Sequence, residues 1–320
     1  MADAIVTLLD IARVNGSDAV AGLIDEAQRP HPEVVYLPAR TIKGQNYKTL
    51  VRVAVPRGGS FRDANKGAKL VKSSYVNRLV ETFIFNPRWE ADKAVADRNE
   101  DGAEAFIALE AGGIMEGAMA DLCEQFYYGG NKYTAAGTAR ASGFPGLVDV
   151  VDTAKVSDVG GTTLPTSVWI VRGGPRQTQW VAGNNGGFQM DNPRIETLYR
   201  QIDGANTLER FTGYVQELLA YPGLQVGSVH SVVRIKGLST DAGKGLTDKL
   251  IFDALALFPE GTDLSNTMIL MNNRSWTQLR DSRTAVNATG AEAPLPDQIQ
   301  GPTGPLPIRP TAAIVNGESI

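Results

Sequence analysis

The sequence predicts an α+β protein built from one long helix, one long hairpin and several short strands. The first observation is a helical pattern over residues 99–128, where apolar side chains recur every three or four residues. The second is a pair of strand-like stretches at 49–55 and 71–85, joined by a glycine-containing segment. The third is a mixture of short elements after residue 165, with strands expected at 167–172, 177–182, 224–235 and 267–271, short helices at 247–258 and 275–283, and a helical region around Leu198 and Tyr199. Helices and strands in separate runs are typical of the α+β class.

The long helix should present one apolar face and need tertiary packing to hold it. Asn99 or Asp97 is expected to cap its start, and Gly129 should end it. Each of three interior glycines weakens the helix by about 1 kcal/mol relative to alanine, so packing must compensate. The predicted apolar face consists of Ala103, Ile107, Ala111, Ile114, Ala118, Leu122 and Phe126.

The two strand-like stretches predict a hairpin of unusual length and charge. The second stretch is expected to place Tyr75, Leu79, Phe83 and Phe85 on one face. A strand of about fifteen residues spans roughly 50 Å at ~3.3 Å per residue. A two-stranded hairpin is marginal alone in water, so this one should rest on something outside its own domain. From Arg40 to Arg78, the basic residues face only Asp63 in opposition. The cations that we expect to make contacts are Arg52, Arg57, Arg62, Lys66, Lys69 and Lys72.

Acidic side chains gather in residues 88–124, next to the basic hairpin in the sequence. If the two charged regions met within one molecule, they would form solvated ion pairs that contribute little to the stability of the fold. If each meets its counterpart on a neighbour, many weak pairs would set the register between subunits. The carboxylates that we expect to meet the hairpin cations are Asp97, Glu100, Asp101 and Glu104.

Composition limits the chemistry of the chain. With 42% hydrophobic and 21% charged residues, its 320 residues are able to build a core. A net charge of -4 argues against a polycation that coats nucleic acid. One cysteine and two histidines exclude a disulfide framework and a multi-cysteine zinc site. The start lacks signal-peptide character, and no 18-residue apolar run predicts a membrane span. We therefore expect no cofactor and no metal.

One segment approaches a phosphate-binding loop. It runs from Gly237 to Gly245 and contains Gly243 and Lys244. A Walker A loop needs four residues between its glycines, and Ser or Thr after the lysine. Here five residues lie between Gly237 and Gly243, and Gly245 follows Lys244. A strand-to-helix turn is the simpler interpretation. A nucleotide-dependent or hydrolytic enzyme remains the competing class, although nothing in the spacing isolates a catalytic residue.

Three further reactive groups have plain structural explanations. His230 lies in an apolar strand, and no second histidine or cysteine is near it in the sequence to form a metal site. Cys123 lies on the long helix and is most simply a packing residue. Lys66 and Lys69 could in principle form an isopeptide bond with an asparagine of a neighbour, but we favour solvated or ion-paired lysines.

Several motifs occur in an order that is similar to a known family. Residues 55–67 form a loop tip, the long helix ends in Phe126-Tyr127-Tyr128-Gly129, and a Phe-Pro-Gly-Leu turn follows at 144–147. A strand-turn-helix at 268–279 and a strand at 306–311 come later. This order resembles the major capsid proteins of tailed double-stranded DNA bacteriophages, which have the Hong Kong 97-type capsid fold.

The resemblance implies a division of the chain, with the peripheral sheet placed before the last part of the axial domain. The implied segments are an N-terminal arm at 1–38, an extended E-loop at 39–86, a peripheral domain with the spine helix at 87–150, the first part of the axial domain at 151–190, the peripheral-domain sheet at 191–236, and the second part of the axial domain with an extended C-terminal tail at 237–320.

The resemblance also implies a function. The chain would be a structural protein that self-assembles as hexamers and pentamers into an icosahedral shell around double-stranded DNA, without sequence-specific binding. Its implied partners are a separate scaffolding protein, a portal protein and a possible decoration protein. No membrane is implied as a partner. It would be located in the virion capsid after assembly in the host cytoplasm. A further alternative is another virion component, such as a decoration or tail-tube protein.

Overall fold

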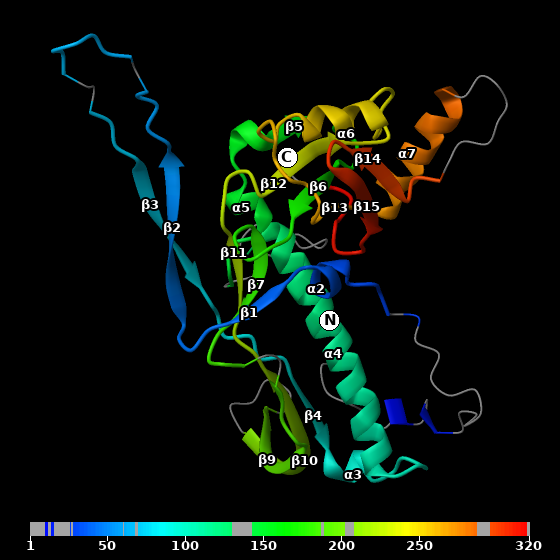
Figure 1. Cartoon of the computed structure of the whole chain (residues 1–320). Coiled ribbons are helices and arrows are strands. Elements are labelled where there is room, and N and C mark those ends of the chain that lie inside the picture. The colour runs from blue at the N-terminus through cyan, green and yellow to red at the C-terminus, as the bar shows by residue number, and fades with distance from the viewer. Residues whose placement is uncertain are drawn as a thin grey trace.

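The structure is a computed structural model that describes most of the chain. The described residues are 10–11, 14–15, 26, 28–59, 61–67, 70–129, 143–186, 189–201, 208–286 and 295–318. A long central helix connects two regions: a small sheet lies beside its N-terminal end, and a larger sheet with helices lies near its C-terminal end (Figure 1). A two-stranded hairpin projects away from both regions. Helices and strands together give the α+β class that the sequence predicts.

Helix α4, Ala103–Tyr128, is the long helix that the apolar periodicity predicts. Four residues of the predicted face are buried, namely Ile107, Ala118, Leu122 and Phe126. The prediction for the start of the helix is wrong, because α3 (Lys93–Ala96) ends with Asp97 as its C-cap and a turn follows before α4 begins. The predicted end is confirmed, because Gly129 is the C-cap of α4. The residue before α4 is Gly102, at a φ of 87°, and the Asn99 side-chain amide donates to its carbonyl at 3.0 Å.

A four-stranded sheet packs beside the first half of α4. It contains β4 (Arg88–Asp92), β8 (Gln189–Met190), β9 (Arg194–Gln201) and β10 (Leu208–Leu219), and β10 pairs antiparallel with the other three. The helical region expected around Leu198–Tyr199 is wrong, because the whole of β9 forms an antiparallel ladder with β10. Trp89 and Ala91 of β4 join Phe106 and Ile107 of α4 in a buried cluster.

A six-stranded sheet forms the larger core. Its strand order is β14 (Gln298–Gly301), β15 (Gly304–Pro310), β13 (Thr267–Met271), β6 (Thr166–Arg172), β12 (Val232–Leu238) and β5 (Val156–Asp158). Every residue of β13 is buried. The helices α6 (Asp248–Leu255) and α7 (Asn273–Val286) accompany this sheet. These strands and helices overlap the ones expected around 167–172, 267–271, 247–258 and 275–283, so the sequence pattern located this core.

A three-stranded sheet connects the larger elements. Its order is β1 (Ala39–Thr41), β7 (Thr178–Ala182) and β11 (Pro222–Val226). The single strand expected at 224–235 is therefore wrong, because a turn at 227–231 separates β11 from β12 and sends them to different sheets. The remaining short elements are α2 (Pro32–Tyr36), α5 (Leu147–Val150) and the 3-10 turn η1 (Thr153–Lys155).

The division of the chain into six segments, which the resemblance implies, stays a prediction. Strand pairing crosses two of their boundaries, since β1 pairs with β7 outside 39–86 and β12 pairs with β5 and β6 outside 191–236. Among the helices of the described residues, none combines the length and apolar character needed to cross a membrane.

Candidate intersubunit surface

The projecting hairpin has two distinct faces. Strands β2 (Asn46–Ala54) and β3 (Ser74–Glu81) pair antiparallel, with Tyr47 opposite Val80 and Arg52 opposite Tyr75. Directly opposite residues share a face. The attached face carries Tyr47, Thr49, Val51, Val76, Arg78 and Val80. The open face carries Lys48, Leu50, Arg52, Tyr75, Asn77 and Leu79.

The attached face fixes the base of the hairpin to β11. The Tyr47 hydroxyl donates to the Gln225 side chain, and burial raises the pKa of Tyr47. The Arg78 guanidinium donates to the Val226 carbonyl at 3.3 Å. Val80 is buried beside these contacts. The contacts at the base therefore set the direction of the hairpin. The rest of the hairpin extends away from the body.

The open face is uncovered by the described residues of the chain. All six of its side chains are exposed, and Leu50 is 69% exposed, Leu79 52% and Tyr75 50%. Near the tip, Phe61 and Leu70 are almost fully exposed. Several large apolar side chains exposed on one projecting element are typical of an interaction site. Sequence analysis missed this property, although apolar and cationic residues alternate visibly at Lys48, Leu50 and Arg52.

One expectation about the second strand is wrong. Tyr75 and Leu79 share the open face as expected, but Phe83 and Phe85 do not extend it. β3 ends at Glu81, because the following residues turn toward the body, where Phe85 forms a bridge with Ala220. Phe83 and Phe85 pack against the core cluster at the C-terminal end of α4 instead.

The hairpin cations have few local partners. The Arg52 guanidinium lies over the Tyr75 ring at 5.4 Å. Near the tip, Arg62 donates to the Lys66 carbonyl at 2.6 Å, and the Lys66 amine pairs with Asp63 at 2.6 Å. The side chains of Lys66 and Asp63 are 72% and 77% exposed, so solvent weakens their pair.

Two of the three remaining predicted cations belong to the described residues. Arg57 and Lys72 are exposed, and they join none of the ion pairs among the described residues. Lys69 lies outside the described residues. The hairpin therefore presents positive charge beside exposed apolar side chains. The described residues of the chain leave most of this charge without an acidic partner.

The predicted carboxylates lie around the start of α4. Asp97 pairs with Lys93 at 2.6 Å, and this hydrogen bond raises the pKa of Lys93. The Glu100 backbone N–H donates to the side chain of Asn15, a residue of the N-terminal segment. Asp101 and Glu104 are exposed, at the positive end of the helix dipole.

One chain does not bring the two charged sets together. The hairpin tip and the start of α4 lie at opposite ends of the molecule (Figure 1). Contacts between these two sets therefore require two copies of the chain. Of the ten predicted contact residues, the nine described ones lie on two separated surfaces, each of which is mainly exposed.

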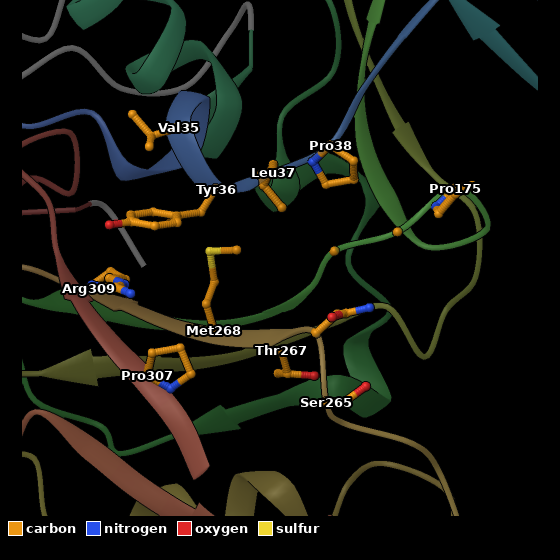
Figure 2. A pocket seen from close by; sticks show the side chains of 13 residues that line it. Val35, Tyr36, Leu37, Pro38, Pro175, Ser265, Thr267, Met268, Pro307 and Arg309 are labelled. Carbon is orange, nitrogen blue, oxygen red and sulfur yellow. The ribbon is translucent and has the colours of Figure 1, made fainter. Parts of the chain in front are cut away.

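A groove of about 520 Å³ lies between α2 and the six-stranded sheet (Figure 2). Its lining is mainly apolar and includes Val35, Tyr36 and Met268. The Arg309 guanidinium lies 4.2 Å from the Tyr36 ring centroid, across the groove. Since no Asp, Glu, His or Cys lines it, the groove offers no acid-base pair or metal ligands.

The segment from Gly237 to Gly245, which is similar to a phosphate-binding loop, uses its lysine for a structural contact. The Lys244 amine donates to the Val159 carbonyl at 2.6 Å, and Gly243 turns the chain at a φ of 74°. Helix α6 begins only later, where the Thr247 side chain accepts from the Leu250 amide. The Lys244 amine thus stabilises the local fold and is not directed at a phosphate-binding site. In the described part of the chain, no three acidic, histidine or cysteine side chains cluster to hold a metal.

Comparison with known proteins decides the family. A family model described as major capsid protein GP7 matches residues 36–319. The chain belongs to this family. No curated protein sequence matches the capsid protein. Among solved structures, bacteriophage Epsilon15 shares 20% identity at a TM-score of 0.68, with 100% of this chain and 98% of that chain covered.

Two further solved structures match the capsid protein less closely. The bacteriophage JBD30 capsid shares 12% identity at a TM-score of 0.48, with 96% of this chain and 99% of that chain covered. The capsid of Myoviridae phage XM1 shares 12% identity at a TM-score of 0.42, with 70% and 97% covered.

The expected family and the Hong Kong 97-type fold are confirmed. The protein is a structural component of a phage capsid that associates with itself, and it is not an enzyme.

Proposed function

We propose that the hairpin cations contact the acidic start of α4 on an adjacent subunit and thereby set the register of the shell. The observation that carries this proposal is the separation of the two charged sets at opposite ends of one molecule (Figure 1). The cations are Arg52, Arg57, Arg62, Lys66, Lys69 and Lys72, and the carboxylates are Asp97, Glu100, Asp101 and Glu104.

Apolar and charged groups have different roles in this contact. Burial of the open face, with Leu50 and Leu79, supplies association free energy of about 25 cal/mol per Å² of apolar surface. One exposed ion pair contributes only about 0.2–1 kcal/mol. Several pairs together favour one register over others, because a shifted register places like charges opposite each other. The charges therefore select among arrangements that the apolar face alone would tolerate.

Charge reversal on the hairpin tests the proposal. We expect R57E/R62E to fold with an unchanged thermal midpoint, because both side chains are exposed, and to fail to form shells. The matched control is R176E/K249E, which makes the same change in net charge at exposed sites elsewhere. Electron microscopy and sedimentation measure assembly. Normal shells from R57E/R62E would contradict the proposal.

A second pair of reversals makes the contact specific. Adding D101K/E104K to R57E/R62E restores opposite signs across the contact, so we expect shells to reappear. D101K/E104K alone should fail like the hairpin variant. If the four-residue variant stays unassembled while both pairs fold, the two surfaces do not face each other in the shell.

We also propose the finer assembly that the resemblance implies. It consists of hexamers and pentamers in an icosahedral shell around double-stranded DNA, formed in the host cytoplasm. A separate scaffolding protein, a portal protein and possible decoration protein would take part. The net charge of -4 supports a container that need not grip its genome. Electron microscopy of the chain expressed with and without the neighbouring genes tests these partners.

A further inference from the structure

Two adjacent tyrosines at the end of α4 hold segments from both ends of the chain. The Tyr127 hydroxyl donates to the Glu33 carboxylate of α2 at 2.6 Å. The Tyr128 hydroxyl donates to the Glu318 carboxylate, near the C-terminus, at 2.8 Å. Glu33 is 0% exposed and Glu318 is 2% exposed. Burial raises the pKa of both tyrosines well above the ordinary value, so both hydroxyls remain protonated donors.

The C-terminal tether is a complete buried network. The Arg234 guanidinium pairs with Glu318 at 2.8 Å and also donates to the Ser167 hydroxyl at 2.9 Å. Ser167 in turn donates to Glu318, and the Arg234 guanidinium lies over the Trp169 ring at 5.0 Å. The charge of this glutamate is therefore compensated. Breaking such a pair leaves a buried charge and is strongly destabilising.

The N-terminal tether lacks this compensation. Glu33 Oε2 accepts no hydrogen bond, and among the described residues no cation pairs with this carboxylate. The Trp180 indole N–H donates to the backbone carbonyl of Glu33, not to its side chain. Burial raises the pKa of the neighbouring Cys123 thiol, and the Glu33 carboxylate raises it further. At the edge of α2, His31 meets Glu116 at 3.0 Å, a contact that is ionic only when the histidine is protonated.

We propose that residues 28–38 form a strap that opens from α4 while the rest of the subunit stays folded. A buried carboxylate without a cation is costly, so Glu33 gains hydration when the strap opens. The C-terminal tail stays closed, because its glutamate has Arg234. The strap lets the N-terminal segment change partners during assembly without unfolding the core. This inference does not rest on the charge-register proposal.

The single cysteine provides a direct probe of the strap. Cys123 is 0% exposed, and labelling by a thiol reagent requires an opening. In the unassembled full-length chain, we expect labelling that depends weakly on urea, as local opening does. Tyr127→Phe should accelerate labelling by about fivefold or more, since Glu33 then loses the hydroxyl that donates to it at 2.6 Å. The matched variant Tyr128→Phe should leave the rate within about twofold and lower the thermal midpoint.

Changes in the two glutamates should differ in sign. Glu33→Gln keeps an acceptor for Tyr127 and removes the charge, so labelling should slow by about fivefold. Glu318→Gln leaves Arg234 unpaired and should lower the thermal midpoint by about 5 °C without accelerating labelling at low urea. The proposal is overturned if Glu33→Gln labels at an unchanged or faster rate. It is also overturned if labelling follows urea as steeply as global unfolding does.

Discussion

The hairpin and the six-stranded sheet both contain leucine and other aliphatic residues, but these reach opposite levels of burial. Strand β13 has the sequence TMILM, and all of its residues are buried. Strand β2 has the sequence NYKTLVRVA, in which leucine and valine lie among polar and cationic residues, and Leu50 is 69% exposed. β13 lies between β6 and β15 and packs on the helices of its own chain. In the described part of the chain, β3 is the single strand that pairs with β2.

Charge placement explains why the hairpin cannot bury its apolar side chains within its own chain. Lys48 and Arg52 flank Leu50 on the open face, so any surface that covers the leucine must also meet two cations. An apolar core cannot do this without leaving charges unpaired. A surface that combines apolar and acidic groups can. The comparison therefore separates residues that fold the subunit from residues that connect subunits.

The largest expected effect comes from the six-stranded sheet. Trp169 is 0% exposed and lies 6.0 Å from the Tyr127 ring. Trp169→Ala should lower the free energy of unfolding by about 3–5 kcal/mol, since it leaves a large cavity. Urea unfolding of the unassembled subunit measures this. Tyr75→Ala, the matched aromatic change in the hairpin, should stay within about 0.5 kcal/mol. Equal losses from both variants would break the comparison.

A smaller effect should appear at the edge of the same sheet and depend on pH. Hydrogen bonds from the Thr163 side chain, the Thr162 amide and the Ser239 hydroxyl lower the pKa of Asp241. A carboxyl with a lowered pKa stabilises the folded state above its unfolded pKa of about 4 and loses this contribution as the pH falls further. Asp241→Asn should therefore be less stable than the wild type at pH 7.

The pH dependence provides the control for Asp241. The difference in thermal midpoint between the wild type and Asp241→Asn should shrink below about pH 4, where the wild-type carboxylate begins to lose its advantage. Taking the difference removes the contributions of the other carboxylates. A constant difference from pH 7 to pH 3 would show that the charge of Asp241 is unimportant.

The sequence predicted elements whose signals are local. The 3.6-residue period located α4, and the charge of the hairpin indicated that it needs a neighbour. Prediction failed where distant pairing decides the structure. Leu198 and Tyr199 were expected in a helical region, but they form a strand because β10 pairs along the whole of β9. The turn at 227–231 was missed because β11 and β12 find partners in different sheets.

The surface residues show the same limit. The positions of Asp97 and Arg57 in opposite charge clusters are visible in the sequence, but their separation in one chain requires the fold. Glu318 gives no local signal at all, since a glutamate near a chain end normally lies in solvent. Its burial depends on Arg234 and Tyr128, which are 84 and 190 residues away along the chain.

The smallest expected effect on folding comes from the open face of the hairpin. L50S/L79S removes two exposed leucine side chains, so the free energy of unfolding of the unassembled subunit should change by no more than about 0.5 kcal/mol. Assembly should nevertheless fail or require a much higher protein concentration, because the contact loses buried apolar area. Light scattering and electron microscopy across a concentration series measure this change.

The matched control places the same substitution on another exposed apolar residue. Phe252 on α6 is 49% exposed, close to the 52% of Leu79, but it lies outside the hairpin. F252S should assemble at the wild-type concentration if exposure alone does not make a contact. Normal assembly of L50S/L79S would show that the open face stays in solvent within the shell. The charges would then have to hold the hairpin without apolar burial, which pairs of about 0.2–1 kcal/mol each do poorly at high salt.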